Sequence, residues 1–224
     1  MSSITILEKP VSGLNTKHTL AGWLASGGLL LAGIGGAFAP WVWRQAVALQ
    51  LTAPGLAEFV KFLAEVRTAQ IQVQRLHFLL PLFVAMLALP VLVENRALGL
   101  PRWWRWLLRL AVIPLALAAL SPVWTPAILM AAEFRTQTLL AGLAVGLALV
   151  APLLRGLPLK WLAVALALAG ATALALAFRQ FALVQPGIEN AYHSRVTPGW
   201  GWWLTAAGFA LSIGGGLWAA FGRK

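Results

Sequence analysis

Side chains that carry charge or bind polar ligands gather in two short stretches late in the chain. AAEFRTQ (131–137) combines a carboxylate with a guanidinium, and QPGIENAYHSR (185–195) adds a second carboxylate, the only tyrosine, an imidazole and an arginine. Together with the histidine at position 77 they form a candidate outer polar pocket: His77, Glu133, Arg135, Glu189, Tyr192, His193 and Arg195. Such a pocket would bind an anionic headgroup or perform acid–base chemistry. The alternative is that these side chains cap helix ends and pair with one another.

Specific catalytic and metal-binding signatures are absent from the sequence. It contains no HExxH, Walker, GxSxG or CxxC pattern, and no cysteine at all. The three histidines, His18, His77 and His193, lack the spacing of metal ligands on one helix. We therefore expect no metal site and no cofactor, assign no catalytic residue, and favour a protein without enzymatic activity.

Composition decides which class of protein holds these residues in place. Hydrophobic residues make up 60% of the 224 residues and charged residues only 10%, whereas a soluble domain carries about 25% charged residues. So few charges do not cover the surface of a soluble globule. The sequence therefore predicts an integral membrane protein.

Six segments have the roughly 17–25 mostly apolar residues that a membrane-spanning helix needs. They are residues 20–43, 76–93, 107–124, 138–154, 159–178 and 200–221. The predicted fold is all-α: a polytopic transmembrane helical bundle of about six spans, formed by a single domain over 20–221. A tail over 1–19 precedes this domain and a short end over 222–224 follows it. The predicted outer loops are 44–75, 125–137 and 179–199.

The distribution of basic residues predicts the orientation of the chain. Of the 17 lysines and arginines, ten fall on the side that holds both termini if the chain crosses six times, and the other seven are spread over the longer loops. Lysine and arginine are enriched on the cytoplasmic side of membrane proteins. Both termini are therefore predicted to be cytoplasmic, and the expected location is a prokaryotic cytoplasmic membrane.

The first apolar segment has a second interpretation. Ala37 and Ala39 stand in the A-x-A arrangement of a signal-peptide cleavage site. The apolar run is long for a signal peptide, and Pro40 would disfavour cleavage, so a retained first span is predicted. Cleavage would leave five spans and an outer N-terminus.

The stretch RWWRWLLR (102–109) is the most concentrated basic and aromatic segment. Its arginines fall on one face of a helix, and its tryptophans suit the depth of lipid headgroups. The predicted interfacial anchor comprises Arg102, Trp103, Trp104, Arg105, Trp106 and Arg109. A nucleic-acid site would require a soluble fold around this patch, so lipid is the predicted partner and nucleic acid is not.

Small residues repeat at every fourth position in three of the predicted spans. Such rows let helix backbones approach closely in lipid. They are Gly28, Ala32 and Gly36; Gly142 and Gly146; and Gly208, Ser212 and Gly216. The sequence leaves open whether each row packs within this bundle or against another protein.

The first outer loop contains an amphipathic segment, APGLAEFVKFLAEVR (53–67). Its apolar residues follow a helical period, with Glu58, Lys61 and Glu65 on the opposite face. It is predicted to form a short interfacial helix. The helix either caps the bundle or offers a docking surface to a partner.

Three functional hypotheses follow. No Asp, Glu, Lys or His lies near the middle of a predicted span, which disfavours an ion-coupled carrier. The first hypothesis is a non-catalytic subunit or accessory of a larger membrane complex, with other membrane subunits as partners. The alternatives are a membrane-embedded lipid-handling enzyme that uses the outer pocket, and a channel or carrier for a neutral solute.

Overall fold

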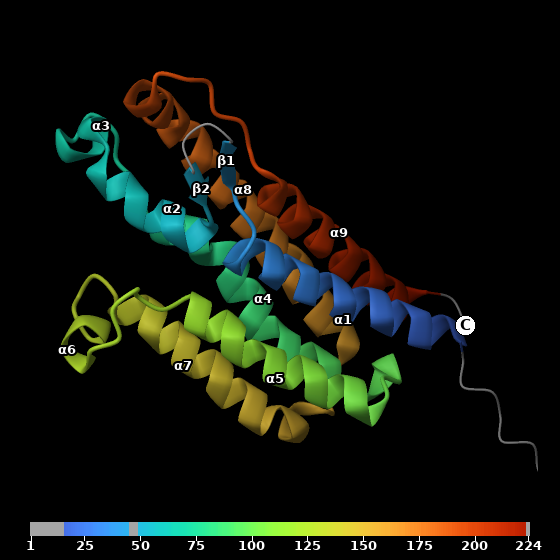
Figure 1. Cartoon of the computed structure of the whole chain (residues 1–224). Coiled ribbons are helices and arrows are strands. Elements are labelled where there is room, and N and C mark those ends of the chain that lie inside the picture. The colour runs from blue at the N-terminus through green and yellow to red at the C-terminus, as the bar shows by residue number, and fades with distance from the viewer. Residues whose placement is uncertain (1–15, 45–48, 223–224) are drawn as a thin grey trace, which may run out of the picture.

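The computed structural model describes residues 16–44 and 49–222, which form a bundle of long helices (Figure 1). Five of these helices are long and apolar enough to cross a membrane, as expected for a multi-pass membrane protein. They are α1 (Thr16–Ala37), α4 (Leu76–Glu94), α7 (Arg135–Val150) with the 3-10 turn η3 (Ala151–Leu154), α8 (Leu159–Tyr192) and α9 (Trp200–Phe221). Among them α4 is central, because it contacts α1, α7 and α8.

A further helix, α5 (Arg102–Ala118), lies beside α4 and α7 and has 17 residues. The predicted span over 107–124 is therefore displaced: the helix begins five residues earlier, directly after Pro101, and ends before Pro122. Proline disfavours helical geometry in the residue before it, which accounts for this end. The RWWRWLLR stretch consequently forms the first two turns of the helix.

Helix α8 continues far beyond the predicted span over 159–178. Its 34 residues correspond to a length of about 51 Å, whereas the apolar layer of a bilayer is about 30 Å thick. The segment predicted as an outer loop over 179–199 is thus helical as far as Tyr192. Polar residues made this segment resemble a loop, but Phe181, Val184 and Ile188 maintain one buried helical face.

Short elements cover the end of the bundle at which α8 projects (Figure 1). Helix α1 ends at Ala37, before the predicted limit at 43, and a two-stranded hairpin follows. The short elements at this end are β1 (Val42–Arg44), β2 (Leu49–Leu51), α2 (Ala53–Phe59), η1 (Val60–Phe62), α3 (Ala64–Arg67) and α6 (Pro126–Leu129). At the opposite end, η2 (Arg96–Leu98) joins α4 to α5. We call the first the α3 end and the second the Glu94 end.

The amphipathic segment 53–67 is helical but interrupted. Leu63 adopts an extended conformation with ψ of 135° and separates η1 from α3. Leu56, Val60 and Leu63 are each at most 3% exposed and belong to the same hydrophobic core as the long helices. The segment therefore caps the bundle with most of its apolar face, whereas Phe62, at 73% exposed, remains open.

Two of the three predicted small-residue rows pack against each other along α1 and α9. A Cβ atom added at Gly208 would lie 2.4 Å from the backbone nitrogen of Ala32, and one added at Gly28 would lie 2.6 Å from that of Ser212. The Ser212 hydroxyl also donates a hydrogen bond of 2.7 Å to the carbonyl oxygen of Ala25. The two backbones are thus in direct contact over several turns.

The remaining residues of these rows face elsewhere. A Cβ atom at Gly36 would meet Leu82 of α4 at 3.4 Å, and Gly216 faces Ala163 of α8. Gly142 and Gly146 of α7 differ from all of these, because among the described residues no atom would lie within 4 Å of a Cβ atom added at either position.

Gly208→Ala should destabilise the bundle, since the added methyl group meets backbone atoms that cannot move aside independently. Overpacking of this kind costs about 1–3 kcal/mol. Gly214→Ala is the matched control on the same helix, because its Cβ atom would enter open space. Thermal unfolding in detergent, followed by tryptophan fluorescence, should show a lower midpoint for Gly208→Ala alone; equal midpoints for the two variants would contradict the α1–α9 contact.

Candidate functional site

Charged side chains at the α3 end form one compact cluster. Lys61 lies between two carboxylates, with its Nζ 2.5 Å from Glu58 Oε2 and 2.6 Å from Glu133 Oε1. Arg75, directly before α4, forms ion pairs with the same two glutamates. Its Nη2 also donates to Gln137 Oε1 at 3.2 Å. We call these five residues the Glu133 cluster; it joins the α2–η1 segment, the start of α4 and the α6–α7 connection.

An aromatic ring supports the two cations of the Glu133 cluster. The Phe134 ring centroid lies 5.2 Å from Lys61 Nζ and 4.7 Å from Arg75 Cζ, within range of cation–π attraction. The hydrogen bond from Lys61, with the charge of Arg75, lowers the pKa of Glu133 against partial burial. Partial burial alone would lower the pKa of Lys61, but its bonds to Glu133 and Glu58 outweigh this and raise it. Two positive and two negative charges thus balance.

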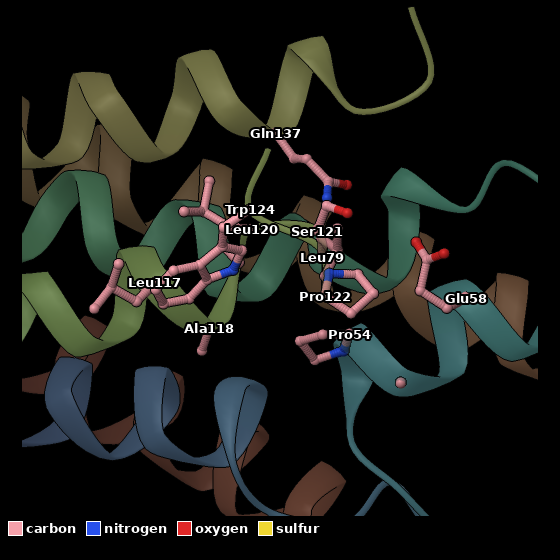
Figure 2. A pocket seen from close by; sticks show the side chains of 12 residues that line it. Pro54, Glu58, Leu79, Leu117, Ala118, Leu120, Ser121, Pro122, Trp124 and Gln137 are labelled. Carbon is pink, nitrogen blue, oxygen red and sulfur yellow. The ribbon is translucent and has the colours of Figure 1, made fainter. Parts of the chain in front are cut away.

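A cavity of about 440 Å³ adjoins the Glu133 cluster. Figure 2 shows Glu58 and Gln137 in its wall, with Pro54 and Pro122 near its middle and Leu117 on the side away from Glu58. Most of its lining is apolar and comes from α2, from the end of α5 and from the segment that follows α5. An apolar cavity with a few polar groups has the character of a ligand site.

The polar residues at the end of α8 form a second group. Glu189 accepts hydrogen bonds from the backbone nitrogen of Val196 at 2.8 Å and from Gln185 Nε2 at 3.2 Å. It thereby holds the chain that returns from α8 to α9. The ring of Tyr192 packs against Phe59, with centroids 5.9 Å apart. Both aromatic residues line a second cavity of about 540 Å³ between α8 and the α2–α3 segment.

The structure divides the predicted outer pocket between these two places. Glu133 belongs to the Glu133 cluster, whereas Glu189 and Tyr192 belong to the group at the end of α8. Within the described residues, no hydrogen bond or ion pair joins the two. The side chains of Arg135, His193 and Arg195 are exposed, and that of His77 is half-buried in the first turn of α4. His193 adopts a left-handed conformation, φ 50°, and ends α8.

A third polar site, at the Glu94 end, was not predicted from the sequence. Glu94 is 2% exposed, and three arginines surround its carboxylate: Arg155 Nε at 2.7 Å, Arg105 Nη1 at 3.4 Å and Arg109 Nη1 at 3.5 Å. Arg109 also donates through Nε to the carbonyl oxygen of Ala148 at 2.7 Å. We call these four charged residues the Glu94 cluster. It joins the end of α4, the start of α5 and the connection between α7 and α8.

The predicted interfacial anchor is divided by this arrangement. Arg102, Trp103 and Trp106 are exposed, as an anchor requires. Trp104 turns inward, and its Nε1 donates a hydrogen bond of 3.0 Å to Ser26 Oγ of α1. Arg105 and Arg109 bind Glu94. The sequence did carry a signal for this pairing: two arginines spaced i, i+4 follow an acidic residue at the end of an apolar segment.

Comparisons with known proteins give no family for this chain. None of the models of known protein families, the curated proteins or the solved structures matches it. No group of three histidines or carboxylates in residues 16–44 and 49–222 is arranged to hold a metal ion. Function is therefore argued from the geometry of the clusters and helix faces.

Glu133→Gln should remove the charge that holds Lys61 and Arg75 together. The pairs are partly exposed, so the expected loss at neutral pH is about 1 kcal/mol or less. Because the pKa of Glu133 is lowered in the fold, its contribution is present above the ordinary carboxyl pKa and disappears as pH falls through the lowered value. Melting midpoints between pH 7 and pH 3 should therefore converge for wild type and variant at the acid end. Arg135→Gln, on an exposed neighbour, should show no such pH-dependent difference, and the same curve for both variants would contradict the cluster.

Glu94→Gln should be far more damaging. It leaves three guanidiniums in contact without their carboxylate, and removing one partner of a buried ion pair costs about 3–5 kcal/mol. The expected result is a large loss in the free energy of unfolding, measured by denaturant titration in micelles. Glu65→Gln is the control, since its only side-chain partner in the described structure is exposed Asn190. A Glu94→Gln protein as stable as this control would refute the central role of the Glu94 cluster.

Proposed function

We propose that this chain is a six-span protein of a prokaryotic cytoplasmic membrane, and that it serves as a non-catalytic subunit or accessory of a larger membrane complex. The observation that carries the proposal is the outward-facing glycine row of α7. Gly142 is exposed, Gly146 is half-buried, and the exposed side chains of Leu139 and Leu143 flank them. Small residues flanked by leucines are typical of surfaces on which a second helix packs.

The glycine row of α7 differs from the small-residue rows of α1 and α9 in having no neighbour in the described structure. Along α1 and α9, the backbone of the neighbouring helix lies less than 3 Å from a Cβ atom added at Gly28 or Gly208. In α7 the row is fully formed, but no described segment of the chain occupies it. A helix of another subunit would complete the contact, so other membrane subunits are the proposed partners beside the lipid bilayer.

Helix α5 supplies the sixth span in this proposal. Its 17 residues are at the short limit of what crosses a bilayer, and it lies beside α4 and α7, two helices that meet the criteria for spanning. Six crossings place both termini at the Glu94 end. The basic residues of that end, including Arg96, Arg102 and Arg155, support a cytoplasmic location for it.

A second function, binding or modification of a lipid at the α3 end, has one specific observation in its favour. The cavity of about 440 Å³ is mostly apolar and has Glu58 and Gln137 at its wall. Against it, Glu58 already binds Lys61 and Arg75, and Gln137 already binds Arg75. The polar groups of the Glu133 cluster thus have a structural role without a ligand.

The subunit proposal is tested by the mass of the particle extracted from native membranes with a mild detergent. Wild type should co-purify stoichiometrically with other membrane proteins through a salt wash. Gly142→Leu should release the partners while leaving the melting midpoint of the isolated chain unchanged, because its side chain enters open space. Gly214→Leu, which also faces open space but on α9, should keep them. A monomeric wild-type particle, or equal behaviour of the two variants, would contradict the proposal.

A further inference from the structure

The Glu94 cluster carries more positive charge than its own carboxylate neutralises. Three guanidiniums surround one carboxylate, and the Nε of Arg105 is buried without a hydrogen-bond partner in the described structure. The side chain of Arg155 is 37% exposed, the most open of the three. A negatively charged group arriving beside Arg155 would therefore meet an attractive field and an accessible donor.

An apolar groove of about 300 Å³ lies between α4 and α8. It is lined by Val84, Leu87 and Val91 of α4 and by Leu162, Ala165 and Ala169 of α8. The α4 residues follow the i, i+3, i+7 spacing of one helix face, and the next positions on that face are Glu94 and Asn95. The groove and the Glu94 cluster therefore share one stripe of α4.

The connection between α7 and α8 is bonded to the end of α4 that carries Glu94. Asn95 Nδ2 donates to the carbonyl oxygen of Leu157 at 2.7 Å. The backbone nitrogen of Arg96 donates to the carbonyl oxygen of Arg155 at 3.4 Å. With the 2.7 Å bond between Arg155 and Glu94, these contacts hold Arg155 at the end of α4, about one helical turn beyond the groove residue Val91. Trp161, which is 74% exposed and precedes the groove residue Leu162, has the position of a tryptophan at headgroup depth.

We propose that this groove and Arg155 together bind one anionic phospholipid. An acyl chain lies along the apolar lining between α4 and α8, and the phosphate lies beside the Arg155 guanidinium in the net positive field of the Glu94 cluster. A lipid with a zwitterionic headgroup fits less well, because its ammonium group would meet the excess of guanidiniums. The lipid acts as a structural ligand that relieves the uncompensated charge.

The experiment compares lipid binding to the delipidated full chain by native mass spectrometry. The probes are phosphatidylglycerol and phosphatidylcholine with identical acyl chains, and inorganic phosphate. Phosphatidylglycerol should bind most tightly, and Arg155→Gln should weaken its binding about five- to tenfold, as expected for one basic contact. Arg135→Gln, at an exposed position of the α3 end, is the charge-matched control and should bind as wild type does.

A second variant keeps the test independent of the ion pairs. Ala165→Phe fills the groove from an exposed position of α8, so it should preserve the fold and weaken binding of phosphatidylglycerol while leaving Arg155 in place. Three results would each overturn the proposal: equal affinity for the two lipids, equal affinity of Arg155→Gln and Arg135→Gln for phosphatidylglycerol, or binding of inorganic phosphate as tight as that of phosphatidylglycerol. The last would show a phosphate site that requires no acyl chain.

Discussion

The buried carboxylate of Glu94 is the interaction on which the arrangement of the helices most depends. A charge removed from water is tolerated only when partners compensate for the lost hydration. Glu94 lies at the carboxyl end of α4, where the helix dipole is itself unfavourable to a negative charge. Its compensation comes from Arg105 and Arg109 of α5 and from Arg155 after η3. One side chain thus couples the central helix to two other segments.

In the Glu133 cluster, too, opposite charges compensate one another, but less hydration is lost because the side chains are partly exposed. Lys61 and Glu133 are 34% and 45% exposed, so water shares in their solvation and each pair contributes little. What the cluster supplies is position, because it connects three segments at the α3 end that are distant in sequence. The two ends of α4 are therefore held by ion pairs of different strength. Between these ends, α4 packs against α1, which in turn packs closely against α9.

Apolar run length predicted most of the helices. Small-residue spacing predicted rows of close helix packing but did not give the partner of each row. The same signals failed where polarity and helical period disagreed. Arg179, Gln185 and Glu189 made the end of α8 resemble a loop, although Val184 and Ile188 preserved a buried face. The charged clusters were harder still to predict from the sequence. Arg155 and Glu94 are 61 positions apart, and only the packing of α4, α7 and α8 brings them together. The predicted outer pocket assumed that residues on one side of a membrane meet, whereas the projecting end of α8 carries Glu189 away from Glu133.

The two kinds of unfilled feature in this bundle point to different occupants. Along α7, the glycine row is apolar and has no side chains beyond Cα, so the backbone of a second helix could approach it closely. Between α4 and α8, the groove is apolar along its length and ends at guanidiniums, so it suits a molecule with an apolar chain and a negative head. A helix in that groove would place its own backbone dipoles beside Arg155 without supplying a full negative charge. For this reason a lipid is the proposed occupant of the α4–α8 groove, and a helix of another protein is the proposed occupant of the α7 face.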